Sequence, residues 1–186
     1  GLSLALDGAR GLAEALQAGP RLDPQFLDGL LHRIDDHLRV LPAPETCDAS
    51  DPTPEKVDHL IDLAREAAAQ VVLDLPAPRS AVARRALANA DHVVITATPD
   101  LAGLRNARKV LDLVRSLRPG EGDPLVVLNK VGIARRPEIA AKDFAAALGL
   151  PLAATLAFDP KSVASAANAG KVLAAEGRGK SMASAL

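Results

Sequence analysis

Polar side chains close two of the apolar runs in this sequence, and their chemistry suits a magnesium ion and a purine base. Asp74 stands near the end of the run 71–75, where a carboxylate can hold Mg²⁺ directly or through water, as a metal ligand and catalytic residue. Asn129 and Lys130 end the run 125–130, and an asparagine amide can both donate to and accept from a purine edge. Open α/β sheets bind ligands at the carboxyl ends of their strands, so we predict a site there.

Each of these residues also has an ordinary structural explanation. Asp74 is a good residue to cap the turn that follows it, and Asn129 with Lys130 before Gly132 fits a common turn sequence. A third segment brings polar residues to a strand end at Asp100. That residue precedes a strong helical pattern, which predicts that it is the N-cap of the helix.

The remaining reactive side chains argue against other kinds of site. None of the four histidines has a partner at metal-ligand spacing, and His92 begins its predicted strand, away from the ligand edge. Cys47 is the only cysteine, which excludes an intrachain disulfide and fits a reducing cytoplasm. The triplet from Gly179 to Ser181 imitates the end of a phosphate-binding loop, but Ala174 stands where that loop needs a glycine.

Short β-branched runs alternate with longer amphipathic stretches, a pattern that predicts an α/β fold with a mainly parallel sheet and helices on both faces. Strands are expected at residues 37–41, 71–75, 92–98, 125–129 and 152–158, and the middle three are apolar enough for burial on both faces. Helices are expected at residues 11–17, 25–34, 54–69, 81–89, 101–117, 140–148 and 162–168. Thr53 and Pro54 are predicted to open the third of these helices.

Length and composition restrict the classes of function. The 186 residues suit one domain, and the net charge of −1 gives no general electrostatic reason to bind nucleic acid or anionic lipid. Aromatic residues make up 2% of the chain, so there are few platforms on which bases of a single strand could stack. No apolar run has the length of a membrane helix. Because the chain starts at Gly1 and its only methionine is Met182, we expect that an upstream part of the natural protein is absent from this sequence.

Taken in chain order, these segments resemble the MinD/ParA family of P-loop ATPases with a deviant Walker A loop. Residues 71–76 look like the second aspartate segment of that family, and Thr98-Pro99-Asp100 is similar to its helix opening. Asn129 stands where the family keeps an adenine-reading asparagine, and Phe158-Asp159-Pro160 resembles the loop that closes over the base. The resemblance implies cofactor-binding roles for Pro99, Asn129, Lys130, Phe158, Asp159 and Pro160.

Four segments look like the CpaE/TadZ branch of the family, which is implicated in assembling and localising Flp/Tad-type pili. They are Asp74-Leu75-Pro76, Leu128-Asn129-Lys130-Val131-Gly132, Arg136-Pro137-Glu138-Ile139 and Lys142-Asp143-Phe144. Two departures stand out: the glycine that commonly follows the aspartate segment in MinD is missing, and so is the Lys-Gly-Gly-x-Gly-Lys-Thr loop. The chain is therefore expected to be a single ATPase domain spanning 1–186, without its P-loop strand and helix.

The resemblance implies an ATP switch in the intact protein, with ATP or ADP and Mg²⁺ as cofactors and none bound by this chain alone. It implies a homodimer in the cytoplasm, at the periphery of the inner membrane or at a cell pole. The implied partners are pilus secretion and assembly proteins at the inner membrane, with no nucleic acid and no transmembrane segment.

Other readings of the same residues remain open. A scaffold with the same fold that has lost hydrolysis would share these motifs. A response-regulator receiver would also pair an aspartate such as Asp74 with a lysine such as Lys130, but these two are too far apart in sequence for a compact receiver. A dinucleotide-binding enzyme is disfavoured because no G-x-G-x-x-G follows any predicted strand.

Overall fold

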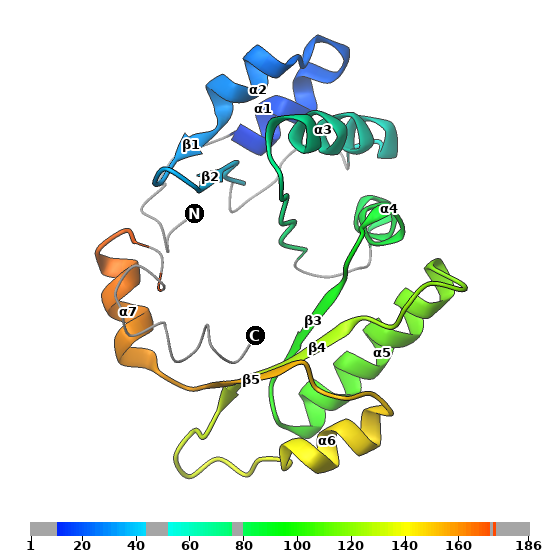
Figure 1. The fold of residues 1–186 in the computed structure, drawn as a ribbon, viewed down its shortest axis with the longest axis vertical. Coiled ribbons are helices and arrows are strands. Elements are labelled where there is room, and N and C mark those ends of the chain that lie inside the picture. The colour runs from blue at the N-terminus through cyan, green and yellow to red at the C-terminus, as the bar shows by residue number, and fades with distance from the viewer. Residues whose placement is uncertain (1–10, 44–51, 76–79, 172, 174–186) are drawn as a thin grey trace. The chain divides into compact units, whose positions relative to one another are not determined.

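The structure is a computed structural model that describes residues 11–43, 52–75, 80–171 and 173 (Figure 1). The chain divides into two compact units, Gly1–Ala86 with Ala167–Lys171, and Leu87–Ala166 with Val172–Leu186. We call these unit 1 and unit 2, and each is described by itself. Cys47 and the triplet from Gly179 to Ser181 lie outside the described residues.

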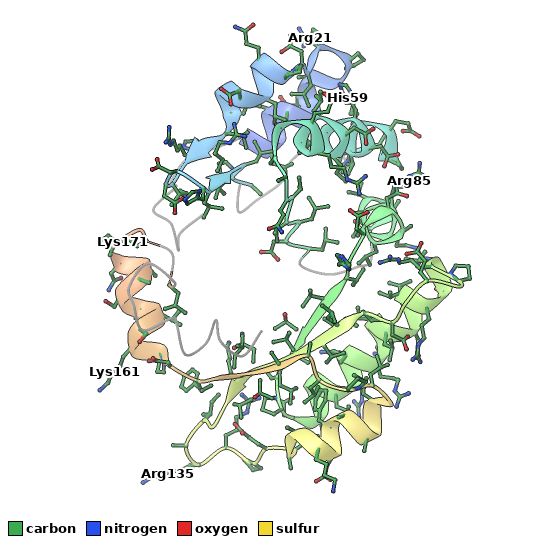
Figure 2. The ribbon with its side chains drawn as sticks, in the orientation of Figure 1. Arg21, His59, Arg85, Arg135, Lys161 and Lys171 are labelled. Atoms are coloured by element: carbon green, nitrogen blue, oxygen red, sulfur yellow. The ribbon has the colours of Figure 1, made fainter. Side chains whose placement is uncertain are left out.

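Unit 1 is mainly helical. Helices α1 (Gly11–Ala18), α2 (Pro24–Leu30) and α3 (Pro54–Ala67) contact one another, with the short 3-10 helix η2 (Gly19–Arg21) between the first two. Their shared core consists of Ala15, Leu22, Leu27, Leu60 and Leu63. His59 on α3 (Figure 2) adds a polar link, since its Nε2 lies 2.9 Å from the carbonyl oxygen of Leu22.

Local sequence signals begin the unit 1 helices. Asp23 caps α2 by accepting a hydrogen bond of 2.7 Å from the backbone N–H of Phe26, and Pro24 takes the first helical position. Thr53 stands at the N-cap of α3 with extended backbone and Pro54 follows it, as predicted. The Thr53 side chain makes no capping hydrogen bond, so the start of α3 relies on the proline and the burial of its apolar face.

The first predicted strand is part of a hairpin, which corrects our expectation that it belongs to a parallel sheet. Strands β1 (His32–Arg33) and β2 (Arg39–Val40) pair antiparallel. Asp35 closes the turn between them, because its Oδ1 accepts hydrogen bonds from the backbone N–H groups of His37 and Leu38. These two bonds hold the pKa of the Asp35 carboxyl below its ordinary value.

The prediction of a buried strand at residues 71–75 is wrong. These residues form no strand, and the Val72 side chain is 92% exposed. An apolar β-branched run becomes a strand only where a neighbour satisfies its backbone N–H and C=O groups, and no described strand pairs with this one.

Unit 2 contains a parallel sheet of three strands in the order β3-β4-β5, which confirms the α/β class. The strands are β3 (Val94–Ala97), β4 (Leu125–Val131) and β5 (Ala154–Ala157). Helix α5 (Leu101–Leu117) connects the first pair and α6 (Ala141–Leu148) the second, and both lie on the same side of the sheet (Figure 1). Parallel neighbours need such crossover connections.

Burial follows position in this sheet. The central strand β4 is buried on both faces, as predicted, with Val126, Val127 and Leu128 at most 4% exposed. In β3 the prediction of two buried faces is wrong: Ile95 and Ala97 are buried, but Val94 is 56% exposed. Among the described strands β3 pairs only with β4, so its other edge has no strand neighbour.

Two further helices complete the described elements. Helix α4 (Ala81–Asn89) matches its predicted bounds, and α7 (Pro160–Asn168) begins two residues before the predicted start. The backbone N–H of Ala83 donates to Ser80 Oγ at 3.1 Å, which satisfies one of the free donors in the first turn of α4. No helix in the described ranges combines the length and apolar character that crossing a bilayer requires.

Candidate functional site

The end of the central strand β4 carries Asn129 and Lys130 in a β-bulge. The register pairs Leu128 with Thr155 and Val131 with Ala157, so β4 has one more residue than β5 between these pairs. Lys130 absorbs the irregularity with φ +60°, in the left-handed region that a lysine rarely adopts. Bulges of this kind often lie beside functional sites, where they re-aim a side chain.

The bulge fixes one half of the Asn129 side chain. Its Oδ1 accepts a hydrogen bond of 2.8 Å from the backbone N–H of Lys130. Within the described part of the chain no group accepts a hydrogen bond from its amide nitrogen, and the residue is only half-buried. Asn129 can therefore offer N–H donors to a ligand at this edge, while Lys130 is exposed beside it.

The end of β3 carries Pro99 and Asp100. The Pro99 side chain is almost fully buried, and its carbonyl oxygen accepts a hydrogen bond of 2.8 Å from the backbone N–H of Ile139. Asp100 is the N-cap of α5, as predicted: its Oδ1 accepts from the N–H of Gly103 at 2.7 Å. Its Oδ2 accepts from Thr98 Oγ1 at 2.9 Å.

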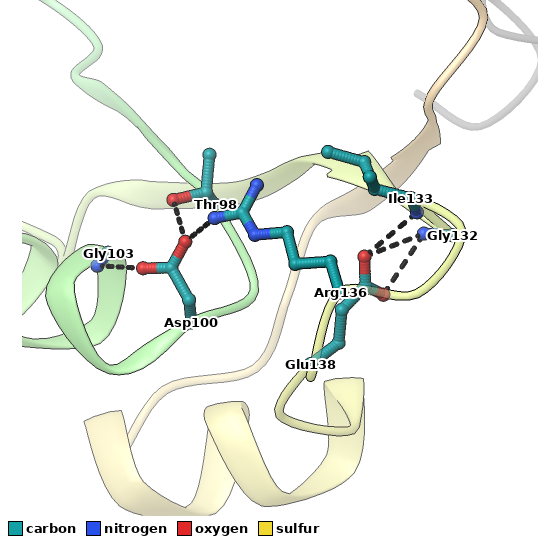
Figure 3. A network of polar contacts seen from close by, with 7 residues as sticks. All are labelled: Thr98, Asp100, Gly103, Gly132, Ile133, Arg136 and Glu138. Carbon is teal, nitrogen blue, oxygen red and sulfur yellow. Dashed lines mark hydrogen bonds and ion pairs between the residues drawn. The ribbon is translucent and has the colours of Figure 1, made fainter.

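Two charged residues of the loop after β4 tie this loop together and to the end of β3 (Figure 3). The Glu138 carboxylate accepts hydrogen bonds of 3.0 Å from the backbone N–H groups of Gly132 and Ile133. Arg136 forms an ion pair with Asp100 through Nη2 and Oδ2. We call the Glu138 hydrogen bonds, without this ion pair, the 132–138 clamp. In the sequence this segment stands out only for its resemblance to the CpaE/TadZ branch, and no pattern there indicates a role for Arg136 or Glu138.

The end of β5 leads into Phe158, Asp159 and Pro160. The backbone N–H of Phe158 donates to the Val131 carbonyl at 2.8 Å, which continues the pairing past the strand, and its ring is 41% exposed. Asp159 accepts hydrogen bonds from the Ser162 N–H at 3.0 Å and from Ser162 Oγ at 2.6 Å. Together with Pro160 in the first position, these bonds start α7.

The structure thus gathers six of the predicted residues at the carboxyl edge of the unit 2 sheet. They are Pro99, Asn129, Lys130, Phe158, Asp159 and Pro160. Asp74 is not one of these residues. It belongs to unit 1, where it is exposed and lies in segment 71–75, which forms no strand. In the described ranges no group of three or more His, Cys, Asp or Glu side chains is placed to hold a metal ion. The magnesium role of Asp74 stays a prediction.

This α/β fold is that of the MinD/ParA-type P-loop ATPases. The structure superposes on a ParA family ATPase from Chlorobium tepidum TLS with a TM-score of 0.80 and 24% identity, covering 92% of this chain and 72% of that one. It superposes on a chain of the MinC:MinD cell division protein complex of Aquifex aeolicus with a TM-score of 0.72 and 20% identity, over 95% and 70% of the two chains. Aquifex aeolicus MinD itself gives 0.70 and 18%, over 91% and 69%.

The sequence is also similar to that of a MinD protein. The chain is 26% identical over 99 residues to the septum site-determining protein MinD of Bacillus subtilis, which is 53% of this chain. The chain spans 37% of the length of that relative. No protein-family profile matches the chain.

The residues at the sheet edge fit one end of a nucleotide and not the other. Asn129 offers amide donors suited to a base, and the exposed ring of Phe158 belongs to the same edge. Among the described strands and helices, no glycine-rich loop leads from a strand into a helix to supply backbone N–H groups for phosphates.

The junction between β3 and α5 generates the first prediction. A Cβ added to Gly103 would lie 2.1 Å from the carbonyl oxygen of Thr98 and 2.8 Å from its Oγ1, so only glycine lets the helix approach the strand this closely. Gly103→Ala should lower the free energy of unfolding by about 1–3 kcal/mol or more. Chemical denaturation of the two proteins measures the difference.

Gly122→Ala is the matched control, because a Cβ there would meet nothing within 4 Å. This control should be close to neutral. Equal stability of the Gly103→Ala variant and the unchanged protein would show that the junction is looser than described.

Proposed function

We propose that the intact protein is a nucleotide-dependent localisation or assembly factor of the MinD/ParA type, which uses this domain as an ATP switch. The observation that carries the proposal is the placement of Asn129 at the carboxyl end of the central strand of a MinD/ParA-like fold. Pro99, Lys130 and the segment 158–160 come from the same edge, where they suit contacts to an adenine nucleotide.

The more specific role rests on the four segments similar to the CpaE/TadZ branch. They support a part in the biogenesis of Flp/Tad-type pili, with assembly proteins at the inner membrane as partners. A homodimer at the inner membrane or a cell pole follows from the same resemblance. Among the similar structures, one holds MinD together with MinC, which supports the idea that this fold presents a surface to a second protein.

Backbone groups that have no strand partner among the described residues support an additional strand in the intact protein. The edge of β3 away from β4 has no described neighbour, and residues 71–75 form no strand. We propose that an upstream strand of the same protein, carrying the phosphate-binding loop, pairs with the open edge of β3 and supplies its backbone partners.

A non-hydrolysing scaffold with the same fold is the second candidate, because hydrolysis depends on residues that this sequence does not contain. The sequence upstream of Gly1 separates the two. A deviant Walker A loop with both of its lysines favours the switch, and a degraded loop favours the scaffold. A receiver domain would instead become phosphorylated at Asp74 by acetyl phosphate.

The second prediction tests the base-reading role of Asn129. In the intact protein, Asn129→Ala should weaken ATP binding by roughly 1–3 kcal/mol, since it removes the amide that reads the base. The free energy of unfolding should change little, because the side chain makes one described hydrogen bond, to its neighbour Lys130. Isothermal titration and denaturation measure the two quantities.

Asn106→Ala is the control for this prediction, since Asn106 is exposed on α5. It should leave ATP binding unchanged. Equal affinity of the unmutated protein for ATP and GTP would rule out Asn129 as a reader of adenine.

The third prediction concerns the 186-residue chain by itself. It should not bind Mg-ATP tightly, because it lacks the backbone N–H groups and lysine that hold the β- and γ-phosphates. Isothermal titration with and without Mg²⁺ is the measurement. Binding in the micromolar range that requires Mg²⁺ would mean that the phosphate site lies elsewhere in this chain.

The fourth prediction concerns the cell. Deletion of the gene should abolish or mislocalise pili, and a copy of the gene should restore them. Electron microscopy of the cell surface counts the pili. Normal numbers at normal positions in the deletion strain would contradict the pilus role while leaving the nucleotide switch to be judged by the Asn129 measurements.

A further inference from the structure

The position of the Asn129 amide depends on a strained piece of backbone. Asn129 and Lys130 form the bulge in β4, and Lys130 has φ +60°. A non-glycine residue keeps such a conformation only where the surrounding structure holds it. The segment that follows, from Val131 to Ile139, must therefore be fixed if Asn129 is to point in a constant direction.

The 132–138 clamp provides the local part of this restraint. Gly132 and Ile133 donate their backbone N–H groups to the Glu138 carboxylate, which closes the loop onto itself. The charge of Glu138 strengthens these hydrogen bonds. Closure of the loop alone does not define where the loop sits relative to β3.

Arg136 provides the second part by linking the loop to another strand end. Asp100 already caps α5 through Gly103 and accepts from Thr98, so its role at the helix start does not require Arg136. The Arg136 and Asp100 side chains are 33% and 21% exposed, so solvent screens their attraction less than at an open surface. The hydrogen bond from Ile139 to the Pro99 carbonyl runs between the same two segments.

We propose that Arg136 is a positioning residue that couples the loop after β4 to the end of β3 and thereby fixes the Asn129 amide for selection of adenine over guanine. The coupling holds Pro99, Asp100 and the Asn129 bulge in one fixed arrangement. Arg136 itself does not contact the base. This inference rests on the nucleotide-binding function proposed above, and it names what sets the specificity of that site.

The test compares Arg136→Gln with Arg135→Gln in the full-length protein. Both variants lose one guanidinium from the same loop, but Arg135 is exposed and extends away from the fold (Figure 2), with no partner among the described contacts. The ratio of ATP to GTP affinity should fall about tenfold in Arg136→Gln, in the range of coupling between contacting residues. It should stay unchanged in Arg135→Gln. Arg136→Lys keeps the charge and should restore most of the ratio.

A second readout separates this inference from the proposed function. The side-chain amide resonances of Asn129, assigned by their loss in Asn129→Ala, should shift or broaden in Arg136→Gln and not in Arg135→Gln. This measurement needs no nucleotide. If the unmutated protein binds no nucleotide but these resonances still move, the proposed function fails and the coupling stands.

Two results would overturn the coupling. One is an unchanged ATP to GTP ratio in Arg136→Gln in a protein that does prefer ATP. The other is a set of Asn129 amide resonances that Arg136→Gln leaves in place. If Arg136→Gln does not fold, Asp100→Asn removes the same ion pair while it keeps a good N-cap residue for α5, and it carries the same two measurements. A change confined to thermal stability would reduce the ion pair to a structural role.

Discussion

Parallel hydrogen bonding through β4 is the constraint on which the rest of the site depends. Because β3, β4 and β5 run in the same direction, the residues that follow them meet at one edge, although they are far apart in sequence. Each strand must then return by a crossover, which α5 and α6 supply on one face of the sheet. The close approach of Gly103 to Thr98 sets where the first of these helices starts, and so where Asp100 lies.

Helices were more predictable from the sequence than strands because their signals are local. The bounds of α4 and α5 match the expected ones, and Asp100 caps α5 as its place before the helical pattern indicated. The strands depended on partners that a pattern cannot show. Residues 71–75 have strand composition but no described neighbour, and one face of β3 is open at Val94. The hairpin at 32–40 follows from the turn at Asp35, whose hydrogen bonds the pattern of apolar residues did not reveal.

The residues of the candidate site also differ in how far the sequence could predict them. Asn129 could be named from its place at the end of an apolar run, whereas Phe158 and Asp159 were named only through the resemblance to the MinD/ParA family. The bulge at Lys130 and the ion pair between Arg136 and Asp100 could not, because both depend on contacts between segments separated by a helix or a loop. Similar structures share 18–24% identity with this chain, a level at which the fold is retained while individual residue roles must be argued from geometry.

The arrangement separates two tasks that a nucleotide switch has to perform. The proposed function assigns reading of the base to unit 2, where the 132–138 clamp, the Arg136–Asp100 ion pair and the bulge all lie. In the proposed intact protein, an additional strand and its loop would hold the phosphates. The same strand would also pair with the open edge of β3. One segment would then both complete the sheet and supply phosphate-binding amides, since a strand inserted at that edge ends at the same carboxyl side. In such a protein the stability of the sheet and the affinity for phosphate are linked, whereas the choice between adenine and guanine depends on residues already in place.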